Sequence, residues 1–155
     1  MKLDNTDRKI LMLLQTDGRA TASHVGEKVH LSVPAAAERI KKLQESGIIK
    51  GYRAVLDTKL LGLDISALIT IVSDSSKYYE KVIKEANLTP EVVRCFATTG
   101  DGSHVLLIQT QNSKSLEILL RKIQSWPGVI RTNTQLILSS YKELTPLYFD
   151  NNHQK

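Results

Sequence analysis

The stretch from Thr21 to Tyr52, TASHVGEKVHLSVPAAAERIKKLQESGIIKGY, constrains the fold more than any other part of the chain. It predicts a short helix, a tight break, a second helix with a basic outer face, and then a hairpin marked by glycine. This order is that of a helix-turn-helix followed by a small wing. A helix presented in this way fits the major groove of duplex DNA.

The ends of these helices carry recognisable capping residues. Thr21 is expected to cap the first helix through its hydroxyl, and Ser32 to cap the second. Pro34 falls in the first turn of the second helix, where its missing N–H has no cost. That helix is expected to run to about Ser46 and to stop at Gly47, a residue type that is common just beyond helix ends.

The outer side of the second helix combines small residues near its start with long basic residues further along. Small residues let the backbone approach base edges, and long basic side chains can reach phosphates. Such cations are usually only solvated, and Glu38 and Glu45 dilute the charge, so basicity alone does not decide between the two interpretations. The residues predicted to contact DNA are Thr21, Ser32, Val33, Pro34, Ala35, Glu38, Arg39, Lys41, Lys42, Lys50 and Arg53. For Lys50 and Arg53, in the expected hairpin over residues 48–56, simple exposure is an equal alternative.

The charge distribution agrees with a polyanionic partner for the first part of the chain. The whole chain carries +5 with a pI near 9.3. Residues 1–60 hold 11 Lys/Arg and 7 Asp/Glu, a net +4, whereas residues 61–155 hold 10 and 9, a net +1. A basic surface favours nucleic acid through counterion release and steering, although an excess this small is not proof.

Composition argues against several other classes of protein. No stretch approaches the ~20 apolar residues that a membrane helix needs, and the polar start MKLDNTDRK lacks the apolar run of a signal peptide. The single cysteine, Cys95, fits a reducing cytoplasm, and its place in an apolar strand favours a small buried hydrophobe over a reactive thiol. The four histidines show no metal-ligand spacing, and no catalytic set is evident, so we expect neither a metal site nor an enzyme.

The remaining segments complete an α+β fold. A helix over about residues 5–16, capped by Asp4, is expected to pack behind the helix-turn-helix. Strands are expected over 65–72, 91–99, 103–110 and 129–138, and helices over 77–86 and, capped by Ser113, 113–125. The order β-α-β-β-α-β is the ferredoxin-like split motif. Its second sheet face has no covering helix, so we expect dimerisation through it.

The predicted domains are therefore a winged helix-turn-helix DNA-binding domain over residues 3–57 and a ferredoxin-like effector-binding and oligomerisation domain over 65–145. Residues 58–64 are expected to form a short connector between them.

These motifs together resemble the Lrp/AsnC family of bacterial and archaeal regulators over nearly the whole chain. LDNTDRKILMLLQTDGR is similar to the family's L-D-x-x-D-x-x-I-L-x-x-L-x-x-(D/N)-x-R, and LSVPAAAERIKKLQESGIIKGYRAVLD to its next conserved block. TTGDGSHVLL and PGVIRTNTQLIL lie where the family has its T-G turn and its P-G-V strand. The resemblance implies dimers that associate into octamers, binding to promoter DNA, and in many members an amino-acid effector bound at a dimer-dimer interface near the turn after the second strand.

The effector turn departs from the commonest family pattern. Gly102 replaces an aromatic residue and Ser103 replaces an aspartate that would hold the ligand's amino group, so leucine is the less favoured ligand and the pocket is expected to be wider or empty. Asparagine-type members share the serine, and a plain β-turn without ligand remains the alternative. The residues predicted to bind an effector are Thr99, Gly100, Asp101, Gly102, Ser103, His104, Thr132 and Thr134. Asp101 either substitutes for the missing carboxylate or only caps the turn. Thr132 and Thr134 either line the same pocket or are present only because threonine is favoured in β-strands.

Two functions compete on this evidence. The first is a cytoplasmic DNA-binding transcriptional regulator whose oligomeric assembly responds to a small effector, which we expect to be an amino acid. The second is an architectural protein that wraps double-stranded DNA without an effector. We expect no cofactor and no membrane partner in either case.

Overall fold

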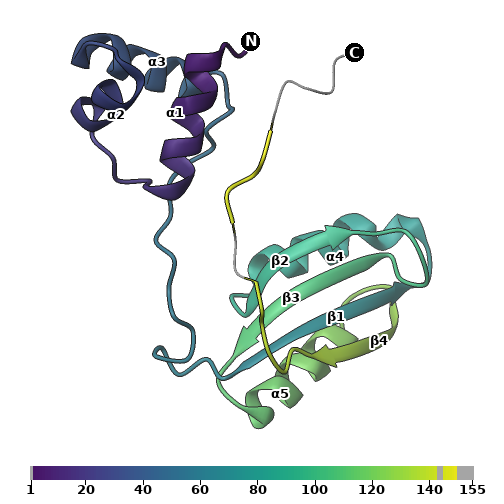
Figure 1. The fold of residues 1–155 in the computed structure, drawn as a ribbon. Helices are drawn as coiled ribbons and strands as arrows, with labels where there is room; N and C mark the ends of the chain where they lie inside the picture. The colour runs from purple at the N-terminus through teal and green to yellow at the C-terminus, as the bar shows by residue number, and fades with distance from the viewer. Residues whose placement is uncertain (1, 143–144, 150–155) are drawn as a thin grey trace. The chain divides into compact units, whose positions relative to one another are not determined.

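The computed structural model describes residues 2–142 and 145–149, so residues 143–144 of the expected second domain lie outside the described part. The fold is α+β, as predicted, and divides into two compact units (Figure 1). We call the first the helical unit, whose described residues are 2–55, 142 and 145–149. The second, residues 56–141, is called the sheet unit.

The helical unit contains α1 (Asn5–Thr16), α2 (Ala22–Val29) and α3 (Val33–Glu45). In this unit the three predicted N-terminal caps, Asp4, Thr21 and Ser32, are all present. Asp4 and Asp7 form a reciprocal capping box on α1, with Asp7 N–H donating to Asp4 Oδ1 over 2.7 Å and Asp4 N–H donating to Asp7 Oδ2 over 3.1 Å. The hydroxyls of Thr21 and Ser32 accept from backbone amides in the first turns of α2 and α3.

The break between α2 and α3 is tight because His30 adopts a left-handed conformation (φ 58°) and the Leu31 N–H donates to the Gly26 carbonyl over 2.9 Å. The returning backbone passes so close to α2 that a Cβ at Gly26 would lie 2.7 Å from the Leu31 oxygen. The apolar sides of the three helices meet in a core that includes the fully buried Ile10, Val25 and Leu43. These contacts hold α3 against the other two helices.

The wing expected over residues 48–56 is not formed as a hairpin. Residues 50–57 carry no strand, and Val55 is 89% and Leu56 65% exposed. A hairpin this short is marginal without a third strand or an apolar surface to cover it. The β-branched pattern therefore indicated extended backbone correctly, but the pairing of that backbone with itself was wrong.

The sheet unit contains the predicted β-α-β-β-α-β order with small shifts at element ends. Its elements are β1 (Ile65–Ser73), a 3-10 turn (Ser76–Tyr78), α4 (Tyr79–Leu88), β2 (Val92–Ala97), β3 (His104–Thr110), α5 (Ser113–Gln124) and β4 (Val129–Leu136). The strands lie in the order β2-β3-β1-β4, and every neighbouring pair is antiparallel. The ferredoxin-like topology is confirmed.

Helices α4 and α5 cover one face of this sheet (Figure 1). The core between them holds Ile69, Ile71, Leu106 and Ile108, none of which is exposed to solvent. The cap of α5 is Asn112, whose side chain accepts from a backbone amide three residues on, and not Ser113 as predicted. Asparagine and serine are both good caps, and only the backbone geometry decides between neighbours.

The opposite face of the sheet is not covered by either helix. The strand register aligns Phe96, Val105, Thr70 and Asn133 in one row across that face. The next row contains Arg94, Leu107, Leu68 and Gln135. The centre of this face, on β1 and β3, is therefore largely apolar, and its edges are polar apart from Phe96 on β2.

Candidate nucleic-acid interface

The outer side of α3 is open to solvent. Val33 is 49% exposed, and the side chains of Glu38, Lys41 and Lys42 are 65%, 72% and 61% exposed. Pro34 is also exposed, while Ala35 is half-buried against the rest of the unit. The structure therefore places these predicted residues along one accessible helix surface.

The two lysines of α3 are each paired with a glutamate one helical turn away. Lys42 Nζ lies 2.7 Å from Glu38 Oε1, and Lys41 Nζ lies 3.6 Å from Glu45 Oε1. The hydrogen bond from Lys42 lowers the pKa of Glu38. Exposed pairs of this kind contribute little to stability, so both lysines can exchange a carboxylate for a phosphate at little cost.

Arg39 is engaged inside the helical unit. Its Nη1 donates to Asp4 Oδ2 over 2.6 Å and to Asp7 Oδ1 over 2.7 Å, which joins α3 to the start of α1. These hydrogen bonds raise the pKa of Arg39. The pKa of Asp4 is lowered, first by the backbone amide of Asp7 and then by Arg39. The DNA contact of Arg39 stays a prediction. Its hydrogen bonds show an additional anchoring role that local sequence could not show, because its partners lie 32 and 35 residues away.

A small hollow of about 280 Å³ lies where α3 meets α1. It is lined by Asp7, Ala35, Glu38, Arg39 and Lys42. The lining therefore combines hydrogen-bond donors and acceptors within the exposed side of α3.

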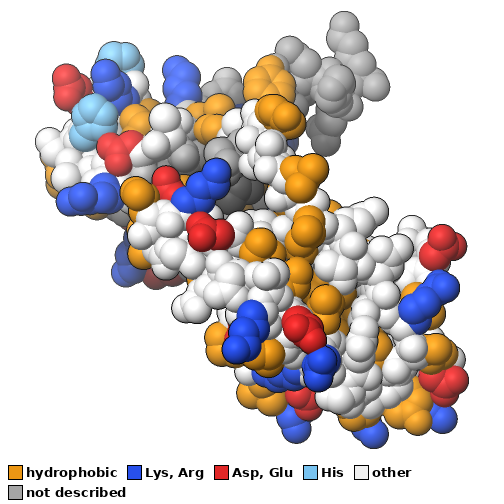
Figure 2. Space-filling view, turned by 90° about the horizontal axis from the view of Figure 1, so that it is seen from below, with side chains coloured by type: hydrophobic (Ala, Val, Ile, Leu, Met, Phe, Trp, Pro, Cys, Tyr) orange, Lys and Arg blue, Asp and Glu red, His pale blue; other side chains and the backbone are white. Residues whose placement is uncertain are grey.

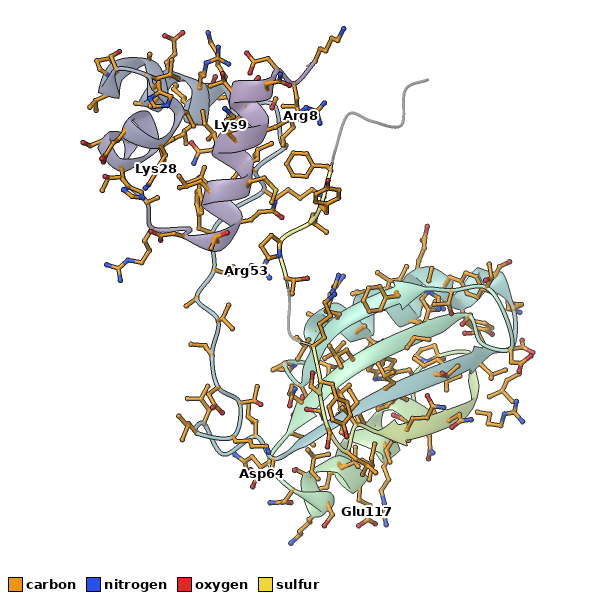
Figure 3. The ribbon with its side chains drawn as sticks, viewed as in Figure 1. Arg8, Lys9, Lys28, Arg53, Asp64 and Glu117 are labelled. Carbon is orange, nitrogen blue, oxygen red and sulfur yellow. The ribbon has the colours of Figure 1, made fainter. Side chains whose placement is uncertain are left out.

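The other predicted DNA contacts lie around α3. Thr21 and Ser32 are exposed at the starts of α2 and α3, and Lys50 and Arg53 are exposed on the extended segment that follows α3. Figure 3 shows Arg53 on that segment. On the face drawn in Figure 2, basic side chains are interspersed with acidic ones, so no uniform positive surface is seen from that side.

Basic residues of α1 and α2 were not singled out from the sequence. Figure 3 shows Arg8 and Lys9 on α1 and Lys28 on α2. These three side chains line the same hollow of the helical unit. No local motif marks them, because they come together only when α1 packs beside α2.

The effector turn between β2 and β3 has an exposed tip and a buried base. Thr99, Gly100 and Asp101 are exposed. At the base, the Ser103 amide donates to the Ile71 carbonyl over 2.8 Å. A Cβ at Gly102 would overlap Thr70 Cγ2 of β1, so the sheet of one chain leaves no free space on that side of the glycine. The wider or empty effector pocket concerns a site between copies and stays a prediction.

Ser103 and His104 form a buried polar group at this base. His104 is 1% exposed, and its Nδ1 lies 2.9 Å from Ser103 Oγ, which in turn lies 2.8 Å from Ser73 Oγ. Tyr79 packs edge-on against the imidazole at 5.0 Å, and burial lowers the pKa of His104. Strand alternation predicts that Ser103 and His104 face opposite sides, but Ser103 precedes the first residue of β3, so alternation does not apply to it.

Thr132 and Thr134 lie on the helix-covered face of β4. Thr132 Oγ1 accepts from Gln124 Nε2 of α5 over 3.2 Å. Ile71 of β1 pairs with His104 of β3 on one side and with Thr132 of β4 on the other. His104 and Thr132 are therefore two strands apart, with Ile71 between them. The structure therefore does not bring the threonines and the exposed tip of the turn together within one chain.

Other chemistry is not indicated by the described residues. Residues 2–142 and 145–149 contain no group of three or more His, Cys, Asp or Glu that could hold a metal ion. Cys95 is half-buried, and burial raises the pKa of its thiol, which argues against a reactive role. Within the same described part, every helix is too short or too polar to cross a membrane.

A helix-turn-helix unit joined to a ferredoxin-like unit defines a class of DNA-binding transcriptional regulators. Residues 3–44 match the family model of the AsnC-type helix-turn-helix domain, and residues 66–147 match that of the Lrp/AsnC ligand binding domain. The chain belongs to the Lrp/AsnC family and is a transcriptional regulator of that type, not an enzyme.

Named relatives and a solved structure support this assignment. The chain is 39% identical over 145 residues to the HTH-type transcriptional regulator FL11 of Pyrococcus horikoshii, covering 94% of this chain and 95% of that protein. It is 34% identical over 139 residues to the regulatory protein AsnC of Haemophilus influenzae, covering 89% and 93%. The solved complex of transcriptional regulator NMB0573 of Neisseria meningitidis with L-methionine is 30% identical, has a TM-score of 0.89 and covers 95% of this chain and 97% of that one.

Proposed function

We propose that this regulator binds duplex DNA through the outer side of α3 and that an amino acid tunes its oligomeric assembly. The single observation that carries the DNA-binding proposal is the exposure of α3 along its outer side, with capped ends and a buried inner side. Such a helix can enter the major groove. Because its target is chromosomal DNA, we place the protein in the cytoplasm.

The residues of the interface are proposed to have different roles. Val33, Pro34 and Ala35 bring the start of α3 close to base edges, and the mixed hollow beside Glu38 suits the donor and acceptor pattern of a base pair. Lys41 and Lys42 contact phosphates, as do Lys50 and Arg53, while Thr21 and Ser32 present helix N-termini to the backbone. Arg39 sets the position of α3 through α1.

We further propose that two copies associate through the uncovered sheet face and that such dimers assemble further, as octamers. The apolar rows on β1 and β3 support this, because an apolar sheet face is stabilised by burial against a second copy.

The effector is proposed to bind between copies, at the exposed tip formed by Thr99, Gly100 and Asp101. The relative in complex with L-methionine supports an amino acid as ligand. The Asp101 carboxylate is available for an ammonium group. Ser103 and His104 support the tip from within the same chain, whereas Thr132 and Thr134 would reach the ligand only from another copy. A ligand that prefers one assembly shifts the population toward it and so changes which operator spacings are bridged.

The DNA-binding proposal is tested by the salt dependence of binding to a duplex selected from a random-sequence pool. Lys42→Ala should weaken binding and reduce the slope of log K against log salt concentration by about 0.9, the value for one phosphate contact. Lys114→Ala, an exposed lysine of α5, is the matched control and should leave the slope unchanged. Equal slopes for both variants and the unmodified chain would remove Lys42 from the interface.

The effector proposal is tested by thermal-shift screening against the twenty amino acids, followed by sedimentation of the stabilised sample. A ligand that raises the unfolding temperature and changes the assembly supports the proposal. If no amino acid stabilises the chain at millimolar concentration, the effector-independent architectural function is favoured instead.

A further inference from the structure

The chain beyond the sheet unit returns to the helical unit. Residues 145–149, Thr-Pro-Leu-Tyr-Phe, pack against α1, and we call them the C-terminal segment. The Leu147 N–H donates to Gln15 Oε1 over 2.6 Å, and Gln15 Nε2 donates to the Leu147 carbonyl over 3.2 Å. One side-chain amide thus satisfies both backbone groups of Leu147, as a neighbouring strand would.

Phe149 supplies the apolar part of the contact. It is half-buried and packs on the core of the helical unit. It lines two hollows at once, one of about 650 Å³ beside Leu11, Leu14 and Tyr52, and one of about 560 Å³ beside Met12. The ring therefore stands as a wedge between two grooves of α1.

We propose that the C-terminal segment is a reversible clasp that docks on α1 and limits the freedom of the DNA-binding helices. The chain leaves the helical unit after Val55, forms the sheet unit, and is attached to the helical unit again through this segment. Docking makes the second attachment in addition to the covalent link at residue 55. The occupant of this surface of α1 is the chain's own C-terminal segment.

Two features suit such a clasp. The grooves that it borders contain no residue of α3, although Lys50 and Arg53 line the larger one, so docking leaves the outer side of α3 itself accessible. The contact is also shallow, because Leu147 is 74% and Tyr148 83% exposed, so little apolar area is buried to oppose release. A contact of this size can be populated or released according to the state of the sheet unit, to which the segment is joined.

Docking is tested by hydrogen exchange of the full chain without DNA. Gln15→Ala removes both hydrogen bonds to Leu147, and we expect exchange of the 145–149 peptide to become roughly tenfold faster. Phe149→Ala should accelerate it as well. The matched controls are Gln111→Ala and Tyr141→Ala, both exposed residues outside the contact, and they should leave the exchange unchanged. Exchange as fast in the unmodified chain as in the Gln15 variant would overturn the proposal.

A second measurement keeps the test independent of any misfolding of a variant. A chain that stops after Tyr141 is titrated with a synthetic peptide of residues 142–155 while backbone NMR signals are followed. Saturable shifts in residues 11–18 and 48–55 support docking, and their absence contradicts it.

The consequence for regulation rests on the proposed function and is tested separately. The chain that stops after Tyr141 should bind a single DNA half-site with unchanged affinity but tolerate a wider range of half-site spacings. An unchanged spacing preference would overturn the role of the clasp in limiting freedom. Docking seen by exchange in a chain that fails to bind DNA would instead count against the DNA-binding proposal alone.

Discussion

Gly26 provides the sharpest test of how the helix-turn-helix is held together. Helix propensity alone predicts that Gly26→Ala stabilises the protein by about 1 kcal/mol, because the residue lies inside α2. The structure predicts the opposite, since the new Cβ would lie 2.7 Å from the Leu31 carbonyl oxygen. The Leu31 backbone is held by the hydrogen bond from its N–H to the Gly26 carbonyl. The Leu31 oxygen therefore cannot move away from the new Cβ without weakening that hydrogen bond.

The size of the effect follows from these opposing contributions. Overpacking of this kind costs about 1–3 kcal/mol, and weakening the Leu31 hydrogen bond costs about 1 kcal/mol more. After subtracting the propensity gain, the helical unit should lose about 2 kcal/mol, which lowers its unfolding midpoint by roughly 8–16 °C. DNA affinity should fall at temperatures near the new midpoint.

The assay separates the two units. Thermal unfolding followed by far-UV circular dichroism reports both of them, whereas fluorescence of the single tryptophan, Trp126, reports the sheet unit, in whose core it is buried. In the Gly26 variant the midpoint temperature of the transition seen by circular dichroism should fall, and the midpoint seen by Trp126 fluorescence should fall by less. Ser23→Ala, at an exposed position of the same helix, is the control and should change stability by less than about 0.5 kcal/mol. A Gly26 variant as stable as the unmodified chain would refute the close packing of the break.

Three further predictions concern particular side chains. Arg39→Ala should lower the stability of the helical unit and weaken DNA binding without changing the salt dependence of that binding. Arg39→Lys should restore stability only in part, because a single ammonium group replaces the planar guanidinium. A salt slope reduced by the amount of one lost phosphate contact would contradict the anchoring role of Arg39. Burial lowers the pKa of His104 in the folded chain. Below about pH 6.5 the unfolded chain therefore binds a proton at this imidazole more readily than the folded chain does. The contribution of His104 to stability is full above that pH and is lost as the solution is acidified. Denaturant unfolding monitored by Trp126 fluorescence should show this loss, and His104→Phe should diminish it; an equal loss in both proteins would rule out His104 as its source. Gly102→Ala should destabilise the sheet unit, because its Cβ would overlap Thr70 Cγ2 and lie 3.0 Å from the Ile71 carbonyl oxygen. Thr70→Ser removes the first contact and should restore stability in part. A double variant no more stable than Gly102→Ala would dispute the contact with Thr70.

Elements with local signals could be predicted from the sequence. The bounds of α1 match the expectation, because Asp4 and Asp7 mark its start by a reciprocal hydrogen bond that needs only nearby residues. The four strands and their order were also predictable, since apolar runs and glycine turns set strand lengths and the split motif sets the topology. Errors at strand ends amount to one or two residues, where backbone pairing rather than side-chain pattern decides.

Features that depend on distant residues could not be predicted. The partners of Arg39 and of Gln15 lie far along the chain, and no periodicity connects them. The missing hairpin after α3 has a related cause, because sequence pattern indicates extended backbone but not which strand, if any, pairs with it. The buried base of the effector turn depends on Thr70 and Ile71 of β1, which approach it only in the folded sheet.

Hydrogen exchange of the full chain, with and without a saturating duplex selected from a random-sequence pool, tests the central proposal most directly. We expect DNA to slow exchange in residues 33–42 of α3, with little change in the sheet unit. Protection confined to other surfaces while α3 exchanges as in the free protein, or no binding even at low salt, would contradict α3 as the DNA-binding element.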